Sequence, residues 1–150
     1  MSQYADVLTC MTNVATLAAA LTEMGYQPQL NTTAQGFGSQ QREAADIVLR
    51  KHDLSQRHNG VHLYGDVAFT RAADGRIMAT VDDSDEHSLN RCLEPNRSSG
   101  EPHWRNAVTR AYTEQHNINV ARERGYVFRG REAVTLPDGR REVKLLFGVR

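Results

Sequence analysis

This 150-residue chain contains two segments with helical periodicity, and each segment is followed by a Gly-Tyr pair. In the first segment, apolar residues recur every three or four positions, which is the pattern of an amphipathic helix, and intervening alanines add helix propensity. Thr12 or Asn13 offers a side-chain oxygen for the N-cap, and Gly25 follows where a left-handed C-cap belongs. The pattern predicts a helix over residues 14–24, with apolar positions at Val14, Leu17, Leu21 and Met24.

The second segment predicts a longer helix over residues 102–124. Pro102 suits the first turn of a helix, and Gly125 is placed to end it. Trp104 stands at the start of an otherwise polar helix, so we expect its bulky ring to pack into the core. One imperfect apolar face is formed by Trp104, Val108, Ala111, Tyr112 and Ile118.

Short apolar runs separated by turn residues predict β-strands in the rest of the chain. Asp74-Gly75 and Asp138-Gly139 are placed to turn two hairpins. The predicted fold class is α+β, an antiparallel sheet with two helices packed on one face, in the order β-α-β-β-β-β-α-β-β. The predicted strands cover residues 5–10, 26–30, 45–50, 66–71, 77–81, 126–136 with an interruption, and 142–149.

Three polar stretches are predicted to be loops. They cover residues 31–41, 52–60 and 82–99, and Asn59-Gly60 adds a strong turn signal to the second of them. Two sequential half-domains of β-α-β-β type are a looser alternative to the single sheet. Loops and sheet edges are the surfaces through which a domain of this kind recognises partners, so residues 31–41 and 82–101 are candidate interaction surfaces.

The length is that of one domain, so we expect residues 1–150 to form a single α+β domain. No apolar run approaches the ~18 residues that a membrane helix needs. The first residues lack the basic start and apolar run of a signal peptide, which predicts a cytoplasmic protein. Cys10 and Cys92 lie far apart and outside any Cys-x-x-Cys pair, so both are expected to be reduced thiols.

Several segments share a pattern with a known family. They are the alanine-rich first helix, the strand Ala45-Asp46-Ile47-Val48-Leu49-Arg50, the hairpin from Asp66-Val67-Ala68-Phe69 to Ala79-Thr80-Val81-Asp82, and above all Val108-Thr109-Arg110-Ala111-Tyr112, Ala121-Arg122-Glu123-Arg124-Gly125-Tyr126 and Pro137-Asp138-Gly139. In these scattered pieces the chain resembles the hypothetical chloroplast reading-frame family of cyanobacteria, algal plastids and some phages, a domain of unknown function.

The resemblance implies an accessory role, because members are associated with AAA-class ATPases and small ferredoxin-like proteins. It also implies that residues 52–64 and 83–102 are insertions, and that a phage-encoded copy would act in the host cytoplasm. The chain departs from the family where its usual Arg-Tyr pair becomes Arg110-Ala111-Tyr112.

Two clusters are candidates for metal binding. His58 and His62 are spaced for one helix face, but Asn59-Gly60 breaks a helix between them and no Glu adjoins His58. The run from Asp82 to His87 could offer oxygen ligands to a hard cation. The EF-hand pattern counted from Asp82 fails, because His87 and Leu93 stand where Gly and Glu are required. We expect no metal site, although cation binding by residues 82–87 stays open.

Motifs for catalysis or for a bound cofactor are also missing from the sequence. Gly36-Phe37-Gly38 lacks the further residues of a dinucleotide turn or a phosphate loop, and no Gly-x-Ser-x-Gly motif occurs. Cys10 or Cys92 with a histidine is a combination that arises often by chance. We therefore predict a protein without catalytic residues and without a cofactor.

The chain has no net charge, but its basic and acidic residues are distributed unevenly along the sequence. Residues 1–102 hold 8 basic and 13 acidic side chains, whereas residues 103–150 hold 10 basic and 5 acidic ones. The two parts could pair within one domain, or the basic part could bind nucleic acid. Arginine suits phosphate, and Tyr112, Tyr126 and Phe128 could stack on unpaired bases. The candidate nucleic-acid-binding residues are Arg105, Arg110, Arg122, Arg124, Arg129, Arg131, Arg140 and Arg141.

The sequence thus predicts a non-enzymatic accessory or regulatory module that acts by protein–protein interaction. An AAA-class ATPase or a second copy of the chain is the expected partner, and no membrane contact is expected. The alternative is binding of RNA or single-stranded DNA through the arginine-rich last third.

Overall fold

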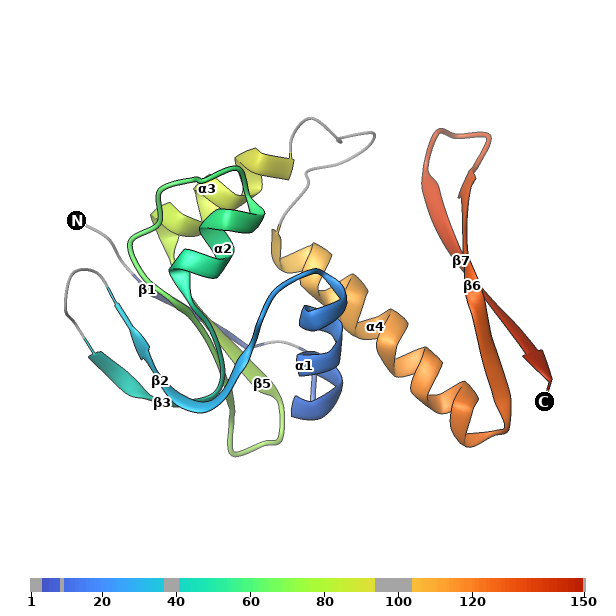
Figure 1. Ribbon diagram of the computed structural model, residues 1–150, viewed down its shortest axis with the longest axis horizontal. Helices are drawn as coiled ribbons and strands as arrows, with labels where there is room; N and C mark the ends of the chain where they lie inside the picture. Colours follow the sequence, from blue (N-terminus) through green and yellow to red (C-terminus); the bar gives the residue numbers. More distant parts are fainter. Residues whose placement is uncertain (1–3, 9, 37–40, 94–103, 150) are drawn as a thin grey trace.

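The computed structural model describes residues 4–8, 10–36, 41–93 and 104–149 (Figure 1). Its elements follow the order β-α-β-β-α-β-β-α-α-β-β. They are β1 (Tyr4–Leu8), α1 (Val14–Glu23), β2 (Gln29–Gln35), β3 (Gln41–Leu49), α2 (Lys51–Arg57), β4 (Val67–Arg71), β5 (Ile77–Asp82), α3 (Asp83–Leu93), α4 (Trp104–Glu123), β6 (Tyr126–Thr135) and β7 (Arg141–Val149).

The strands form two separate antiparallel sheets. Five of them make the main sheet in the order β1-β5-β4-β3-β2, and β6 pairs with β7 in a second sheet. The predicted α+β class with antiparallel strands is confirmed. The predicted β4–β5 hairpin is present in the register Ala68↔Thr80, and Gly75 takes the left-handed conformation at its turn, with φ +90°.

One face of the main sheet carries the core. Ile47, Phe69 and Ala79 point from neighbouring strands into a single buried cluster. Helix α1 contributes Leu17 and Leu21 to the same cluster, and α4 contributes Trp104, Val108 and Tyr112. Both predicted helices therefore pack on one sheet face, and Trp104, with 1% of its surface exposed, occupies the core as expected.

Local signals explain the ends of α1. The Asn13 side chain accepts a hydrogen bond from the Thr16 backbone N–H at 2.9 Å, which selects Asn13 over Thr12 as the N-cap. At the other end the Tyr26 N–H donates to the Leu21 carbonyl, and Gly25 has φ +96°. This is the left-handed C-cap that the sequence predicts.

The predicted loops over residues 52–60 and 82–99 are wrong, because α2 and α3 occupy much of them. Each helix buries one leucine, Leu54 in α2 and Leu89 in α3, in the core cluster. Short polar helices gain most of their stability from such tertiary packing, which periodicity alone does not reveal. The predicted strand at 26–30 and loop at 31–41 are also corrected, since β2 spans Gln29–Gln35; Phe37 and residues 94–101 lie outside the described part.

The terminal hairpin stands apart from the main sheet, with α4 between them (Figure 1). Its turn is as predicted: the Gly139 N–H donates to the Leu136 carbonyl, and Gly139 has φ +87°. Strand β6 is continuous from Tyr126 to Thr135, and a register shift between Phe128 and Gly130 marks a bulge. In the described part of the chain, no helix is long and apolar enough to cross a membrane.

Candidate interaction surface

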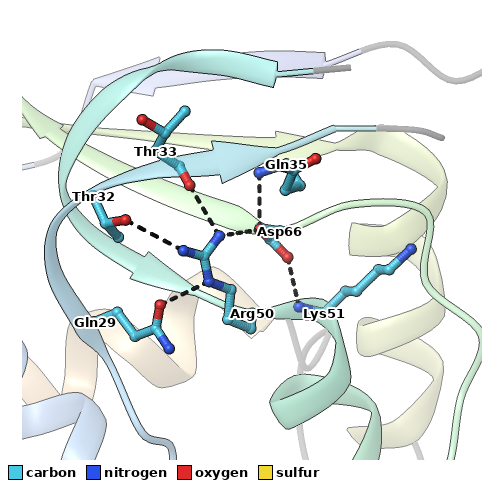
Figure 2. A network of polar contacts seen from close by, with 7 residues as sticks. All are labelled: Gln29, Thr32, Thr33, Gln35, Arg50, Lys51 and Asp66. Carbon is cyan, nitrogen blue, oxygen red and sulfur yellow. Dashed lines mark hydrogen bonds and ion pairs between the residues drawn. The ribbon is translucent and has the colours of Figure 1, made fainter. Parts of the chain in front are cut away.

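An Arg50–Asp66 network joins the ends of three elements in the main sheet (Figure 2). Asp66, which is 3% exposed, accepts hydrogen bonds from the Gln35 N–H, the Lys51 N–H and Arg50 Nη1, each at 2.8 Å. Oδ2 of Asp66 therefore accepts hydrogen bonds from β2 and from Arg50, and Oδ1 accepts one from the first residue of α2.

The Arg50 guanidinium, which is partly exposed, makes three further hydrogen bonds. It donates to the Gln29 side chain at 2.8 Å, to the Thr33 carbonyl at 2.9 Å and to the Thr32 hydroxyl at 3.3 Å (Figure 2). Such a network fastens the edge strand β2 to the rest of the sheet. We interpret it as a structural clamp. Nothing in the residue pattern points to it, because its members are spread from Gln29 to Asp66.

A second network runs from α4 to the end of α2. Trp104 Nε1 donates to the Tyr26 hydroxyl at 2.9 Å, and that hydroxyl lies 2.6 Å from His58 Nε2. Burial raises the pKa of Tyr26 and lowers that of His58. A neutral His58 can accept a hydrogen bond from the Tyr26 hydroxyl, which in turn accepts one from Trp104 Nε1. The polar atoms of the three side chains are therefore hydrogen-bonded to one another. The Nε2 atom of His58 is occupied by this contact.

The acidic run from Asp82 to His87 forms the beginning of α3. Asp82 caps the helix by accepting from the Asp85 N–H at 3.0 Å. Asp85 accepts from the Tyr64 N–H at 2.8 Å and the Gly65 N–H at 3.0 Å. Its pKa is raised by burial, against which these hydrogen bonds act. Asp82 and Asp85 thus bind nearby backbone N–H groups, and Glu86 pairs with Arg105. Among the described residues, no group of three or more His, Cys, Asp or Glu side chains could hold a metal ion.

A depression of about 530 Å³ lies beside the first turns of α3. His62, Tyr64, His87 and Arg91 contribute to its lining, and the rings of His62 and Tyr64 meet edge to face. Cys10 is exposed and Cys92 is partly buried, and both are free thiols. The lining of the depression also includes Ser84 and Ser88, and in the described part of the chain no hydrogen bond joins either hydroxyl to His62 or His87.

Three of the eight candidate nucleic-acid-binding arginines are held in ion pairs. Arg105 pairs with Glu86 of α3, Arg131 pairs with Glu114 of α4 at 2.9 Å, and Arg140 pairs with Asp138 at the hairpin turn. The Arg141 side chain lies outside the described part. The rest are exposed and have no ion pair within the described ranges: Arg110, Arg122, Arg124 and Arg129.

Exposed apolar side chains gather on the β6–β7 hairpin. Single exposed apolar residues are ordinary on a protein surface, but several on one element indicate an interaction site. No described side chain of residues 126–149 is buried. Of the five large apolar side chains that are exposed in the described ranges, the hairpin holds Tyr126 (44%), Val143 (45%), Leu146 (42%) and Val149 (76%), and β2 holds Leu30 (55%).

One hairpin face is directed toward α4. Tyr126 and Phe147 line a cavity of about 250 Å³ together with Val120 and Ala121 of the helix. The Phe128 and Phe147 rings lie 5.8 Å apart, and the Arg131 guanidinium lies 5.0 Å from the Phe128 ring centre. These contacts place the aromatic residues and Arg131 on the same face. We call β6, β7 and the facing side of α4 the hairpin surface.

The sequence analysis names sheet edges and the two polar stretches, 31–41 and 82–101, as candidate surfaces, and it does not single out this hairpin. A signal is present in the period-two run Val143, Leu145, Phe147 and Val149. By itself, that run predicts only an ordinary strand of one sheet. Because β6 and β7 are separate from the main sheet, only α4 of the described elements covers this run, and Val143 and Val149 remain exposed.

Comparison of the chain with protein-family models, with curated proteins and with solved structures finds no match. The resemblance to the chloroplast reading-frame family therefore stays a prediction, and the assignment of function has to rest on the hairpin surface itself.

Proposed function

We propose that this protein is a non-enzymatic accessory or regulatory module that binds another protein through its hairpin surface. The concentration of exposed apolar side chains on β6 and β7 carries the proposal. A two-stranded hairpin is marginally stable by itself in water, and this one contacts the body mainly along α4. Binding a partner would cover its apolar side chains.

The charges on the hairpin favour a protein partner over nucleic acid. Arg131 and Arg140 are held in ion pairs with Glu114 and Asp138, and Lys144 is in register opposite Glu132. Each of these pairs reduces the positive potential that a phosphate backbone would require. The apolar side chains beside them fit the buried centre of a protein interface.

Binding of RNA or single-stranded DNA is the alternative. Arg122, Arg124 and Arg129 are exposed near the aromatic residues Tyr126 and Phe128, a combination that can contact phosphates and stack on bases. An AAA-class ATPase as the partner, and a cytoplasmic location, are supported by the family resemblance and the sequence pattern, and they belong to the same proposal.

The test is a pull-down from the source cell with tagged protein, with nuclease added to half of the sample. Three proteins are compared: the unchanged chain, the double variant Leu146→Ser/Val149→Ser, and the control Leu30→Ser. The control removes from β2 an apolar side chain whose exposure, 55%, lies between those of Leu146 and Val149. We expect one protein partner to survive nuclease with the unchanged chain and the control and to be lost with the double variant.

The proposal would be contradicted if nuclease abolished the recovery of every protein partner and a labelled oligonucleotide bound the purified protein directly. Its affinity would fall steeply as salt rises, because phosphate contacts release counterions. The variant Arg124→Glu/Arg129→Glu would then lose binding while staying folded, and Leu146→Ser/Val149→Ser would retain it.

A further inference from the structure

We infer that the partner of the hairpin surface is a second copy of this chain, joined by antiparallel pairing of β7 with β7 about a two-fold axis at Val143. This inference rests on the proposed function and specifies its partner. The product is one four-stranded antiparallel sheet in the order β6-β7-β7-β6. It would convert two marginal hairpins into a sheet of ordinary size.

The open edge of β7 is the first argument. Proteins protect exposed edge strands with bulges, irregular backbone or charge, because a regular edge pairs with other strands. In β2, one of the two outer strands of the main sheet, Asn31 has φ +51° and the register shifts between Thr33 and Gln35. In β6 the bulge next to Gly130 has the same effect. Strand β7 has neither a bulge nor a left-handed residue over its nine residues, and its charged residues Arg141, Glu142 and Lys144 are of mixed rather than single sign.

The backbone N–H and carbonyl groups of Val143 are oriented so that this edge can pair with another strand. At the turn, the Leu136 N–H donates to the Arg140 carbonyl. Antiparallel ladders alternate between bonded and non-bonded pairs, so the peptide groups of Glu142 and Lys144 are directed toward β6. The Val143 N–H and carbonyl are then directed toward the open edge, where an identical strand can exchange both hydrogen bonds with them.

Charge complementarity is the second argument, and it sets the register. Pairing centred on Val143 places Glu142 of each chain opposite Lys144 of the second copy. Since Lys144 is already in register with Glu132 of its own chain, each lysine would lie between two glutamates on one sheet face. Cross-strand pairs of opposite charge stabilise a sheet and like pairs destabilise it.

The edge of β6 fails the same criterion. Self-pairing centred near its middle would place Arg131 opposite Arg131, or Glu132 opposite Glu132, of the second copy. Pairing through β7 also keeps the aromatic faces of both hairpins, with Tyr126 and Phe147, on one side of the sheet. The two α4 helices lie on that same side, so each would cover half of it.

The test is the molar mass of the purified protein, measured by size exclusion with light scattering over a concentration series. The unchanged chain is expected to reach twice its 16.8 kDa. Glu142→Lys alone and Lys144→Glu alone are expected to lower that mass twofold, because each sets like charges opposite one another. Glu23→Lys, at an exposed position in α1, makes the same charge change as the first variant and should remain dimeric.

Mixing the two charge variants provides the decisive measurement. The lysine introduced by Glu142→Lys in one chain would face the glutamate introduced by Lys144→Glu in the other. The unchanged Lys144 of the first chain would face the unchanged Glu142 of the second, so an equal mixture should return to the doubled mass. Val143→Pro, which removes an N–H directed away from β6, should be monomeric. Trp104 fluorescence, which reports on the body, verifies that every variant is folded.

A monomeric unchanged chain at every concentration would overturn this inference, as would charge variants that stay dimeric or a mixture that stays monomeric. The proposed function would survive any of these outcomes if a partner of different sequence is still captured by the unchanged chain and lost with Leu146→Ser/Val149→Ser. It would fail separately if that double variant retained every protein partner other than a second copy of the chain.

Discussion

The main sheet with its helices and the β6–β7 hairpin bury their apolar residues very differently. In the body, Leu17, Ile47 and Leu54 have no exposed surface. In the hairpin, the comparable residues Phe147 and Leu146 are half-buried and exposed, respectively. The body therefore derives stability from a closed core, whereas the hairpin depends on its ladder, on cross-strand pairs and on a few contacts with α4. An element of the second kind can bind a partner without disturbing the fold.

The largest effect is expected from Phe69→Ala, in the centre of the body. Phe69 is 1% exposed on β4. Its truncation should lower the free energy of unfolding by about 3–5 kcal/mol, because the transfer free energy of the ring is lost and a cavity is left. Denaturant unfolding followed by Trp104 fluorescence measures the loss, since buried Trp104 should emit in the blue and shift red on unfolding. The same loss from Phe147→Ala would end the distinction between body and hairpin.

A somewhat smaller effect is expected from Asp66→Ala in the Arg50 network. The variant removes the acceptor of the Gln35 and Lys51 N–H groups and the carboxylate that pairs with Arg50. Part-buried donors left unpaired and a broken charged contact should together lower the unfolding free energy by about 3 kcal/mol. Asp46→Ala is the matched control, because Asp46 accepts one exposed hydrogen bond, from the Arg71 N–H. Equal losses for the two variants would contradict the clamp interpretation.

The His58 contact predicts a pH dependence that belongs to the body. Burial lowers the pKa of His58 below its ordinary value of 6.5, so the unfolded chain takes up a proton at higher pH than the folded one does. Stability should be fully present above that value and be lost as pH falls from it toward the folded pKa. The slope from this one group should not exceed about 1.4 kcal/mol per pH unit.

Comparison of the unchanged chain with His58→Gln between about pH 5 and about pH 7 isolates this effect. Glutamine cannot titrate but can still accept the Tyr26 hydroxyl bond. The variant should show a flatter stability profile over this range. An identical slope in both proteins would assign the dependence to other groups.

The smallest effect on stability is expected from Leu146→Ser in the hairpin. The side chain is already exposed, so the unfolding free energy should change by less than about 0.5 kcal/mol. Partner capture should nevertheless fall. Amide hydrogen exchange sharpens the comparison, because hairpin amides of the isolated chain should exchange faster than those of β3 and β4. Uniform protection across both regions would show that the hairpin is as stable as the body.

Local chemistry determined several elements from the sequence by itself. Asn13 and Gly25 set the two ends of α1, and the Pro137-Asp138-Gly139 turn set the terminal hairpin. The position of Trp104 in α4 predicted its burial. In each case the signal and the structure lie within a few residues of one another, so the pattern is sufficient.

Tertiary structure alone decided the remainder. Helices α2 and α3 form because Leu54 and Leu89 reach a core assembled from distant strands. The start of α2 is also stabilised by Asp66, which accepts a hydrogen bond from the Lys51 N–H. The same holds for the separation of β6 and β7 from the main sheet, which turns an ordinary alternating strand into an exposed surface. Periodicity shows which side of a strand is apolar, but only the packing of the whole chain decides whether that side is covered.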